Sequence, residues 1–354
     1  MQYGFSIKRK CYLLSVLLMT VWLTGCVQEE FESTPSPAGN GIRFTLTVPD
    51  VNLPSVSSRT MTGTGTAKKE DEIETVDILV FDMSKTPAVY LECVSATGVT
   101  QDLADNSTVS FSAVLSPTTA STCIVVVANK ELDNIVSGFM KGTTTKVEAM
   151  EKMLHAQTGK WLADGSTTDG YTRIPMYGEK VISKITPSMD PITGINMKRM
   201  LARIDIRNNS ATSNFTVEEV YLANYNTTGY IAPAWNTNGQ VTEPAPDTPV
   251  LPTGSGKMTE EGNAILYSVN GNTPYDGEIY TFESLAAGDA GGAGQDGEAS
   301  RKDATCLIVK GKIGTGESTF YRVDFTKTGN VGEQVEYLPL KRNHKYIITI
   351  TQAL

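Results

Sequence analysis

The sequence Ile42-Arg43-Phe44-Thr45-Leu46-Thr47-Val48 alternates strictly between apolar and polar side chains. This period of two residues is typical of a β-strand that buries one face in a core. At ~3.3 Å per residue the stretch would span roughly 23 Å, which is enough to cross a small β-sandwich. The alternation therefore predicts a strand whose buried side chains are Ile42, Phe44, Leu46 and Val48.

The polar segment Ser57-Ser58-Arg59-Thr60 follows this strand in the sequence. An arginine-specific protease could cut such a segment after Arg59, which would leave Thr60 as the new N-terminus. We therefore interpret the strand as removable. Under this hypothesis the strand completes the fold during export, and its removal opens a groove for a strand from another subunit.

The N-terminus has the pattern of a bacterial lipoprotein signal. Basic residues at positions 8–10 precede the apolar run Cys11–Leu23, which is too short for a comfortable transmembrane helix. Leu23-Thr24-Gly25-Cys26 then has the form of a lipobox. Cys26 is therefore predicted to become the lipidated first residue, acylated with palmitate. An ordinary signal peptide that happens to contain a cysteine is the alternative.

The chain of 354 residues has a formal net charge of −9 at pH 7. Removal of residues 1–25 would take away three positive charges and no negative one, which changes the formal charge to −12 (−9 − 3). A protein this acidic is not expected to bind nucleic acid or anionic membrane surfaces. We expect membrane contact only through the lipid on Cys26, before processing.

Short apolar segments separated by turn residues recur along the chain, a pattern that favours β-sandwiches over helical folds. The first of them, Ile73–Asp82, suggests a strand buried on both faces. The other predicted strands are Tyr90–Val94, Thr108–Leu115, Thr122–Ala128, Val217–Asn224, Ile265–Val269, Ile279–Phe282, Thr305–Val309, Ser318–Phe325 and Tyr346–Thr351.

Two segments have the apolar spacing of helices, Leu132–Met140 and Val147–Ala156. Thr145 and Glu148 stand at the spacing of a capping box at the start of the second segment. The segment Met197–Arg207 mixes apolar and basic residues, and it is predicted to form one long strand that joins two domains.

The sequence contains neither an enzyme motif nor a cofactor motif. The two histidines, His155 and His344, fall in a predicted helix and beside a terminal strand, and no Gly-x-Ser-x-Gly motif supports a Ser-His-Asp arrangement. The segment Gly254–Met258 lacks the leading glycine and the Ser/Thr of a phosphate loop. No Cys or His residues stand at zinc-ligand spacing. We therefore predict that the protein is not an enzyme and has no cofactor or metal site.

Two features leave alternatives open. Carboxylates in the acidic loop Ala286–Asp303 could line a calcium site, although their spacing does not fit the helix-loop-helix pattern, and a solvated loop is the other interpretation. These carboxylates are Asp289, Asp296, Glu298 and Asp303. One disulfide is compatible with the cysteines Cys93, Cys123 and Cys306, although Cys123 is expected to pack as a small hydrophobic residue.

A set of motifs occurs in a fixed order along the chain. The lipobox and Arg59-Thr60 come first, and five segments follow them: Glu72–Asp82, Val126–Lys130, Ile174–Gly178, Met197–Ile206 and Leu338–Ile350. The last segment contains Arg342-Asn343-His344-Lys345-Tyr346. In this order the motifs resemble those of a fimbrillin, a type V pilin of the kind made by Bacteroidales, and the resemblance covers most of the chain.

The resemblance implies a mainly β protein with two tandem transthyretin-like β-sandwich domains and a few short helices. It implies export as an outer-membrane lipoprotein precursor and display at the cell surface in a fimbrium. The corresponding parts of the chain are a signal peptide at 1–25, a lipidated pro-segment with the removable strand at 26–59, an N-terminal sandwich domain at 60–196 and a C-terminal sandwich domain at 197–354.

In that family an arginine-specific protease removes the first strand, and a strand from a neighbouring subunit fills the vacated groove, a form of β-augmentation. The implied partners are therefore other fimbrial subunits, from which this chain accepts a donor strand. Shaft-forming members carry a C-terminal extension as donor, whereas only Gln352-Ala353-Leu354 follow Thr351 here. We therefore expect a tip position and adhesion to a host or bacterial surface ligand. The alternatives are that the strand Tyr346–Thr351 itself moves to act as donor, that the chain is an atypical shaft subunit, and that it is an anchor subunit.

A competing hypothesis is an outer-membrane lipoprotein that keeps its lipid and its first strand and binds polysaccharide or protein. Such a protein would use aromatic side chains in a cleft. The candidates for this aromatic platform are Trp161, Tyr171, Tyr230 and Trp235. Under the tip hypothesis the loops Asn236–Gly262 and Ala286–Asp303 are candidates for partner contact instead, because recognition is often carried by loops on a rigid scaffold.

Overall fold

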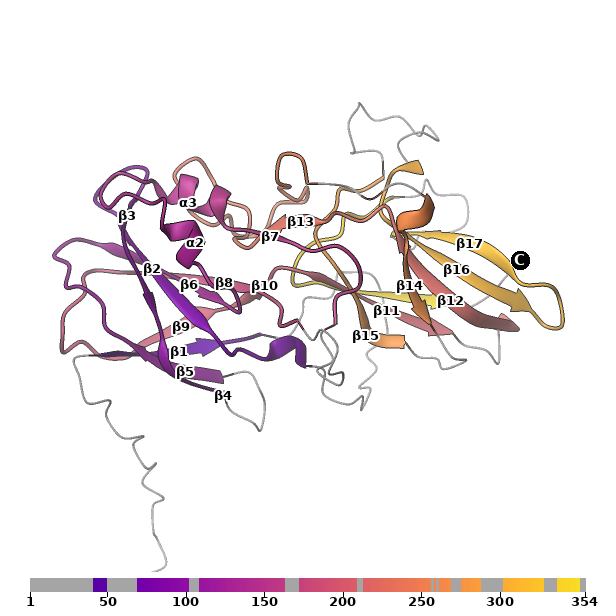
Figure 1. Ribbon diagram of the computed structural model, residues 1–354, viewed down its shortest axis with the longest axis horizontal. Helices are drawn as coiled ribbons and strands as arrows, with labels where there is room; N and C mark the ends of the chain where they lie inside the picture. Colours follow the sequence, from indigo (N-terminus) through magenta and orange to yellow (C-terminus); the bar gives the residue numbers. More distant parts are fainter. Residues whose placement is uncertain are drawn as a thin grey trace, which may run out of the picture. The chain divides into compact units, whose positions relative to one another are not determined.

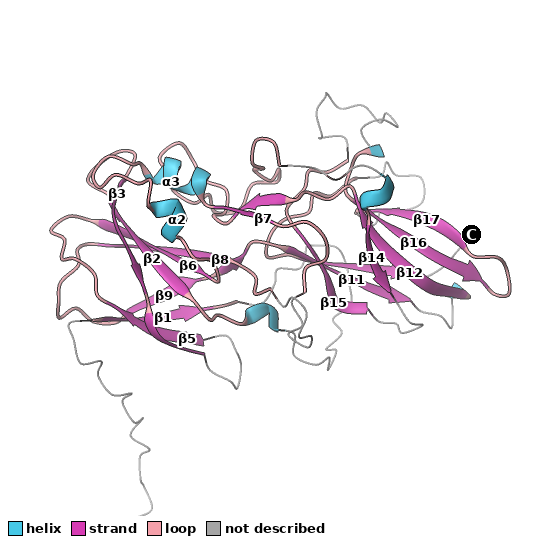
Figure 2. Ribbon diagram, in the orientation of Figure 1, coloured by secondary structure: helices cyan, strands magenta, loops and turns pink. Residues whose placement is uncertain are grey.

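The computed structural model describes residues 41–49, 69–101, 108–162, 172–208, 213–255, 258, 261–268, 275–287, 302–327 and 336–350. In this part of the chain β-strands dominate and the two α-helices are short, which confirms the predicted mainly β fold class (Figure 2). Within the same ranges no helix is both long and apolar enough to cross a membrane.

Two sheets from the first half of the chain face each other as a sandwich (Figure 1). The smaller sheet has the strand order β4-β5-β1-β9 and the larger has the order β10-β8-β6-β2-β3. The strands are β1 (Ile42–Thr47), β2 (Val76–Asp82), β3 (Val89–Ser95), β4 (Thr97–Gln101), β5 (Thr108–Ala113), β6 (Thr122–Ala128), β8 (Met176–Ile182), β9 (Ile192–Asn196) and β10 (Lys198–Arg199).

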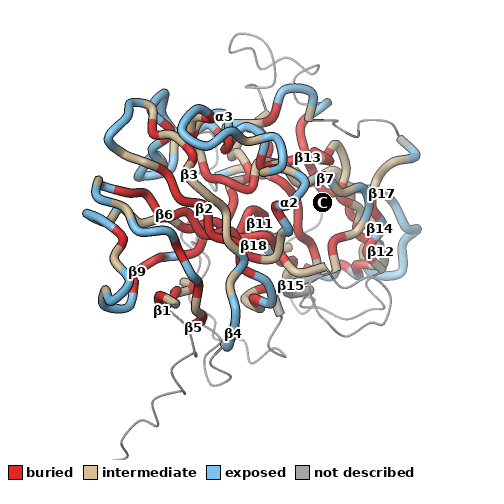
Figure 3. The backbone as a smooth tube through the Cα atoms, turned by 60° about the vertical axis from the view of Figure 1, so that its left-hand side comes forward, coloured by how far each residue is buried: buried red, intermediate tan, exposed pale blue. Residues whose placement is uncertain are grey.

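Strands β2 and β6 lie in the middle of the larger sheet and are buried on both faces (Figure 3). In β2, Leu79 and Phe81 pack in one apolar cluster, whereas Ile78 and Val80 pack in the cluster between the two sheets. Both faces of the larger sheet are therefore covered, which explains why the sequences of these two strands are nearly continuous apolar runs. The prediction of burial on both faces is confirmed for β2, although the strand begins at Val76 instead of Ile73.

A second pair of sheets is built from the second half of the chain and encloses its own apolar cluster. Their strand orders are β15-β11-β18 and β14-β12-β16-β17, and a two-stranded sheet pairs β13 with β7. The strands are β7 (Leu154–Ala156), β11 (Ala202–Asn208), β12 (Phe215–Ala223), β13 (Thr228–Tyr230), β14 (Ile265–Ser268), β15 (Tyr275–Thr281), β16 (Cys306–Ile313), β17 (Thr319–Asp324) and β18 (Lys345–Ile350).

The helix predictions were right in place and wrong in length. Helix α2 covers only Asp133–Val136, and α3 covers Lys146–Lys152. After α3 the chain does not continue as a helix to Ala156, because Leu154–Ala156 forms β7 and pairs with β13. His155 therefore lies in a strand, which corrects the prediction that it lies in a helix. Pairing with a strand distant in the sequence has overridden the local helical pattern.

The predicted capping box at the start of α3 is confirmed. The Thr145 hydroxyl accepts a hydrogen bond from the Glu148 backbone N–H at 3.2 Å, and the Thr145 N–H donates to the Glu148 carboxylate at 2.7 Å. The hydrogen bonds of Thr145 to this carboxylate lower the pKa of Glu148. The box fixes the start of a helix whose residues Ala149 and Met150 are fully buried.

The single long strand predicted at Met197–Arg207 is wrong. Lys198–Arg199 forms β10 in the larger first sheet, and Ala202–Asn208 forms β11 in the second sandwich. Between them, the Met200 N–H bonds the Pro175 carbonyl at 3.0 Å, and the Leu201 carbonyl accepts from the Asn343 N–H at 2.9 Å. The chain therefore passes from one sandwich to the other here, which interrupts the strand.

The other predicted strands agree with the structure to within four residues at each end. Among the described strands, β4, β8, β9 and β13 were not predicted, and β7 was predicted to be helical. In β9 a glycine at position 194 with φ +73° interrupts the alternation of apolar residues, and a left-handed residue of this kind gives no strand signal in the sequence.

We expect Thr145→Ala to lower the free energy of unfolding by about 1 kcal/mol, because it removes the N-cap acceptor of α3. Urea denaturation followed by circular dichroism measures the change. Thr143→Ala is the matched control, since Thr143 is exposed and lies just outside the box. Equal destabilisation by the two substitutions would contradict a specific role for the capping box.

Candidate functional site

Strand β1 lies inside the smaller sheet and is paired along both of its edges. It pairs antiparallel with β5, where Phe44 faces Phe111 and Leu46 faces Val109. On the other edge it pairs parallel with β9, where Leu46 faces Ile195. Without β1, the edges of β5 and β9 would both expose unpaired backbone groups, which are a template for another strand.

The four apolar side chains that alternate in the sequence all point into the sandwich. Phe44 and Leu46 are at most 1% exposed, and Ile42 and Val48 are 3% exposed. The Phe44 ring stacks on Phe111, with the ring centroids 4.9 Å apart and the planes 8° from parallel. The position of β1 is therefore a groove lined by core side chains, and we call it the β1 groove.

Arg199 of β10 holds the end of the β1 segment. Its Nη1 donates to the Pro49 carbonyl at 2.9 Å and also to the Asn343 side-chain oxygen at 2.9 Å. Its Nη2 pairs with the Asp71 carboxylate. The guanidinium is only 3% exposed, so these contacts lie in a water-poor environment where hydrogen bonds to a charged group are strong.

The contacts of Arg199 lie on both sides of the predicted cleavage point. Pro49 precedes Arg59 in the chain, and Asp71 follows it. One buried side chain thus joins the β1 segment, the start of the next segment and the turn at Asn343. We call these contacts the Arg199 clamp.

A second arginine extends the buried polar network next to the clamp. Arg203 bonds Glu70 through Nη1 at 2.8 Å and Asp205 through Nε at 2.8 Å. The Tyr280 hydroxyl donates to Glu70 at 2.8 Å, and burial, with the nearby Glu70 charge, raises the pKa of Tyr280 well above its usual value. Burial opposes the charge of Arg203, but the Asp205 hydrogen bond and the Glu70 charge outweigh it and raise the pKa of Arg203.

Only some of the predicted site residues belong to the described part of the chain. The four residues of the removable strand come together in the core, as described above. Cys26, Arg59 and Thr60 lie outside the described residues. Lipidation and proteolytic processing therefore stay predictions.

The roles of Arg199, Arg203 and Glu70 were missed at the level of the sequence. The one available signal was the pair of arginines inside the apolar segment Met197–Ile206, where a polar residue at a core position needs a partner. The partners themselves lie about 130 residues earlier in the chain, at 70 and 71. No local pattern connects residues that far apart.

Cys93 and Cys123 are free thiols within the described part of the chain. Cys123 is fully buried in β6, as expected for a small hydrophobic residue. Burial raises the pKa of Cys93 to about 12 and that of Cys123 to about 11, so both are protonated at neutral pH. Neither thiol has the lowered pKa of a reactive cysteine.

The described ranges contain no group of three or more His, Cys, Asp or Glu side chains that could hold a metal ion. Of the carboxylates considered for calcium, Asp303 is exposed. The other three, at positions 289, 296 and 298, lie outside the described residues.

The aromatic platform considered for polysaccharide does not form as a unit. Trp161 is 3% exposed and packs edge-on against Phe282, with ring centroids 6.1 Å apart. Tyr171 lies outside the described residues. Tyr230 and Trp235 are half-buried and pack edge to face against each other at 5.0 Å. Trp161 therefore serves the core and is not available for stacking on a ligand.

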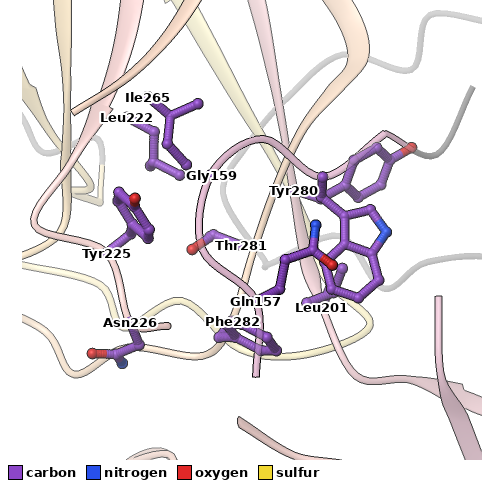
Figure 4. A pocket seen from close by; sticks show the side chains of 11 residues that line it. Gln157, Gly159, Leu201, Leu222, Tyr225, Asn226, Ile265, Tyr280, Thr281 and Phe282 are labelled. Carbon is purple, nitrogen blue, oxygen red and sulfur yellow. The ribbon is translucent and has the colours of Figure 1, made fainter. Parts of the chain in front are cut away.

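The pocket beside Trp161 is too small for a ligand (Figure 4). Its volume is about 10 Å³, the space of roughly one water molecule. The Thr281 hydroxyl, from one of the lining residues, is buried and finds no hydrogen-bond partner among the residues that the structure describes. A single water in the cavity would satisfy this hydroxyl.

Comparison with known proteins gives one family match. Residues 42–190 match the model of the family described as major fimbrial subunit protein (FimA). Comparison with curated protein sequences gives no match.

The chain is also similar to solved structures at low identity. A candidate cell adhesion protein from Parabacteroides distasonis is 16% identical over 88% of this chain and 89% of that chain, with a TM-score of 0.45. The tip fimbrial protein Mfa3 from Porphyromonas gingivalis is 16% identical over 87% and 94%, with a TM-score of 0.45. The fimbrial anchor protein Mfa2 from the same organism is 13% identical over 80% and 81%, with a TM-score of 0.33.

The family match begins at Ile42, the first residue of β1, and extends through most of the first sandwich. It thus includes β1 and its neighbour β5, whereas β9 (Ile192–Asn196), on the other edge of β1, begins after the match ends. The resemblance to fimbrial subunits predicted from the sequence is confirmed over residues 42–190, which match the major fimbrial subunit (FimA) family.

Proposed function

We propose that this fimbrial subunit is exported as a lipoprotein, cut after Arg59, and assembled by replacement of β1 with a strand from another subunit. The observation that carries the proposal is the position of β1, which is buried in mid-sheet although it belongs to the segment before Arg59. The role is structural rather than enzymatic, in keeping with the fimbrial subunit family.

The energetics of the β1 groove favour exchange over simple loss of the strand. Burying four such side chains contributes roughly 6–12 kcal/mol gross, at about 1.5–3 kcal/mol each. An empty groove would forfeit this burial and would also leave the edges of β5 and β9 unpaired. A strand with apolar residues at alternate positions would restore both the apolar burial and the backbone hydrogen bonds to β5 and β9, which is the basis of β-augmentation.

The register of β1 defines what a donor strand must offer. It would run antiparallel to β5 and parallel to β9, as β1 does. Its apolar side chains would occupy the sites of Phe44 and Leu46, and a backbone carbonyl would replace that of Pro49 on Arg199. The Arg199 clamp is thus proposed to hold β1 until cleavage and to fix the register of its replacement.

The proposal also includes predictions on four further points: lipidation at Cys26, the tip position, adhesion, and the domain limits 60–196 and 197–354. N-terminal sequencing of the protein extracted from the cell surface tests the processing step directly. A start at Thr60 supports the proposal. An intact lipidated Cys26 supports the competing hypothesis of a lipoprotein, or an anchor subunit, that keeps its first strand.

Arg59→Ala is expected to keep the chain monomeric and to exclude it from polymers, because β1 would stay covalently attached in its groove. Size-exclusion chromatography after incubation with the arginine-specific protease and shaft subunits measures this. Arg59→Lys should behave in the same way, since only arginine is recognised. Polymer incorporation of either variant at the wild-type level would contradict the proposed processing.

A synthetic peptide of residues 41–49 should rebind the cut subunit and compete with the donor strand. The same peptide with Phe44→Ala should bind about a hundredfold or more weakly, because truncating a buried Phe costs about 3–5 kcal/mol. Fluorescence polarisation of labelled peptide measures both affinities. Thr45→Ala is the matched control on the outward face of β1. Equal affinities for the Phe44→Ala and Thr45→Ala peptides would rule out insertion in the observed register.

Arg199→Lys should release the β1 fragment at least tenfold faster after cleavage, because lysine cannot contact Pro49, Asn343 and Asp71 together. Mass spectrometry of the released fragment over time measures the rate. Arg322→Lys is the control, since Arg322 pairs with Asp324 in the second sandwich at 2.7 Å. Release at the wild-type rate from a folded Arg199→Lys protein would show that the Arg199 clamp does not retain β1.

A further inference from the structure

A cavity of about 270 Å³ lies between the loop at residues 233–250 and the turn at residues 341–344. Four prolines of the loop form an apolar wall. The facing side carries three basic side chains and an imidazole, which are Lys198, Lys341, Arg342 and His344, and the lining also includes the carboxylates of Glu243 and Glu283. All residues that line this cavity lie outside residues 42–190, which match the fimbrial subunit family.

Arg342 is a fixed part of the wall. Its Nε donates to Glu283 at 2.8 Å, and its Nη1 and Nη2 donate to the backbone carbonyls of Ile231 and Tyr230 at 2.7 and 2.8 Å. The side chain is only 7% exposed. Arg342 therefore gives the cavity its shape, while its charge is paired with Glu283.

The two lysines are held far more loosely. Lys198 pairs with Glu243, and the Lys341 Nζ lies 3.2 Å from Asp247. Both carboxylates belong to the loop, and the Glu243 side chain is 59% exposed while that of Asp247 is fully exposed. Pairs with such exposed carboxylates contribute little, so an anion that enters the cavity can replace them.

The surroundings of Lys198 favour a negative partner. Burial, followed by the nearby positive charge of Arg342, lowers the pKa of Lys198. A negative group beside Lys198 would relieve this repulsion, because opposite charges at close range stabilise each other most where water is partly excluded.

His344 adds a hydrogen-bond acceptor to the cavity, whereas the two lysines can only donate. Its Nδ1 lies 2.7 Å from the Arg342 carbonyl oxygen. A carbonyl can only accept, so Nδ1 carries the proton, and in the neutral ring Nε2 remains as an acceptor. Burial lowers the pKa of His344, which favours this neutral ring at pH 7. An acceptor of this kind suits a hydroxyl group.

We propose that this cavity binds an acidic sugar, such as a hexuronic acid residue of a glycan. Lys198 and Lys341 bind the sugar carboxylate, the proline wall packs against the ring, and His344 accepts a hydrogen bond from a hydroxyl. The volume of 270 Å³ is slightly below the roughly 300–1,000 Å³ of sites for drug-sized ligands, so the cavity accepts one ring. The inference does not depend on strand exchange.

Titration of the full chain with methyl glucuronide and with methyl glucoside, followed by saturation-transfer NMR, tests the proposal. The two probes share the sugar ring and differ in the carboxylate. We expect the glucuronide to bind and the glucoside to show no transfer. Equal binding of both sugars, or binding of neither, would overturn the proposal. Tighter binding of inorganic phosphate than of the glucuronide would reduce the cavity to a general anion site and would also overturn it.

Variants of the lining residues distinguish binding in this cavity from adventitious binding elsewhere on the protein. The double substitution Lys198→Met and Lys341→Met should abolish glucuronide binding, whereas Lys327→Met, which alters an exposed pair with Glu336, should not change it. Glu243→Gln should strengthen binding roughly two- to fivefold, because it frees Lys198 from an exposed competitor. Glu243 is exposed, so this variant keeps its fold. Unchanged or weaker binding by Glu243→Gln would contradict the assigned role of Lys198.

Discussion

The insertion of β1 between β5 and β9 is the constraint on which the first sandwich depends. A strand in this position satisfies backbone groups on two neighbours and supplies part of the core between the sheets. Backbone groups that lose their partners away from water are costly, so the position has to be filled at every stage. A subunit that gives up its own strand must therefore receive another.

Arg199 connects this local constraint to the rest of the molecule. The guanidinium joins the end of β1, the segment around Asp71 and the turn at Asn343. Asn343 has a left-handed backbone with φ 55°, a conformation that asparagine adopts more readily than most residues. The same turn carries Arg342 and Lys341, which line the cavity next to the loop at residues 233–250. One tight turn thus serves both the Arg199 clamp and the cavity.

The two candidate sites differ in the chemistry they offer. The β1 groove is apolar and is bordered by two strand edges, so it selects an extended chain with alternating side chains. The cavity is lined by prolines, lysines and an imidazole, so it selects a small, charged and hydroxylated ligand. A fimbrial subunit with both features would separate assembly from recognition on its surface.

The sequence by itself determined strands such as β1 and β6 and their buried faces, since the alternation in Ile42–Val48 and the continuous apolar run of Thr122–Ala128 are local properties of the chain. The capping box at Thr145 was predictable for the same reason. Only the tertiary structure decided where α3 ends, where Met197–Arg207 breaks, and which carboxylates meet Arg199 and Arg203. These features depend on contacts between residues far apart in the chain, and neither periodicity nor propensity records such contacts.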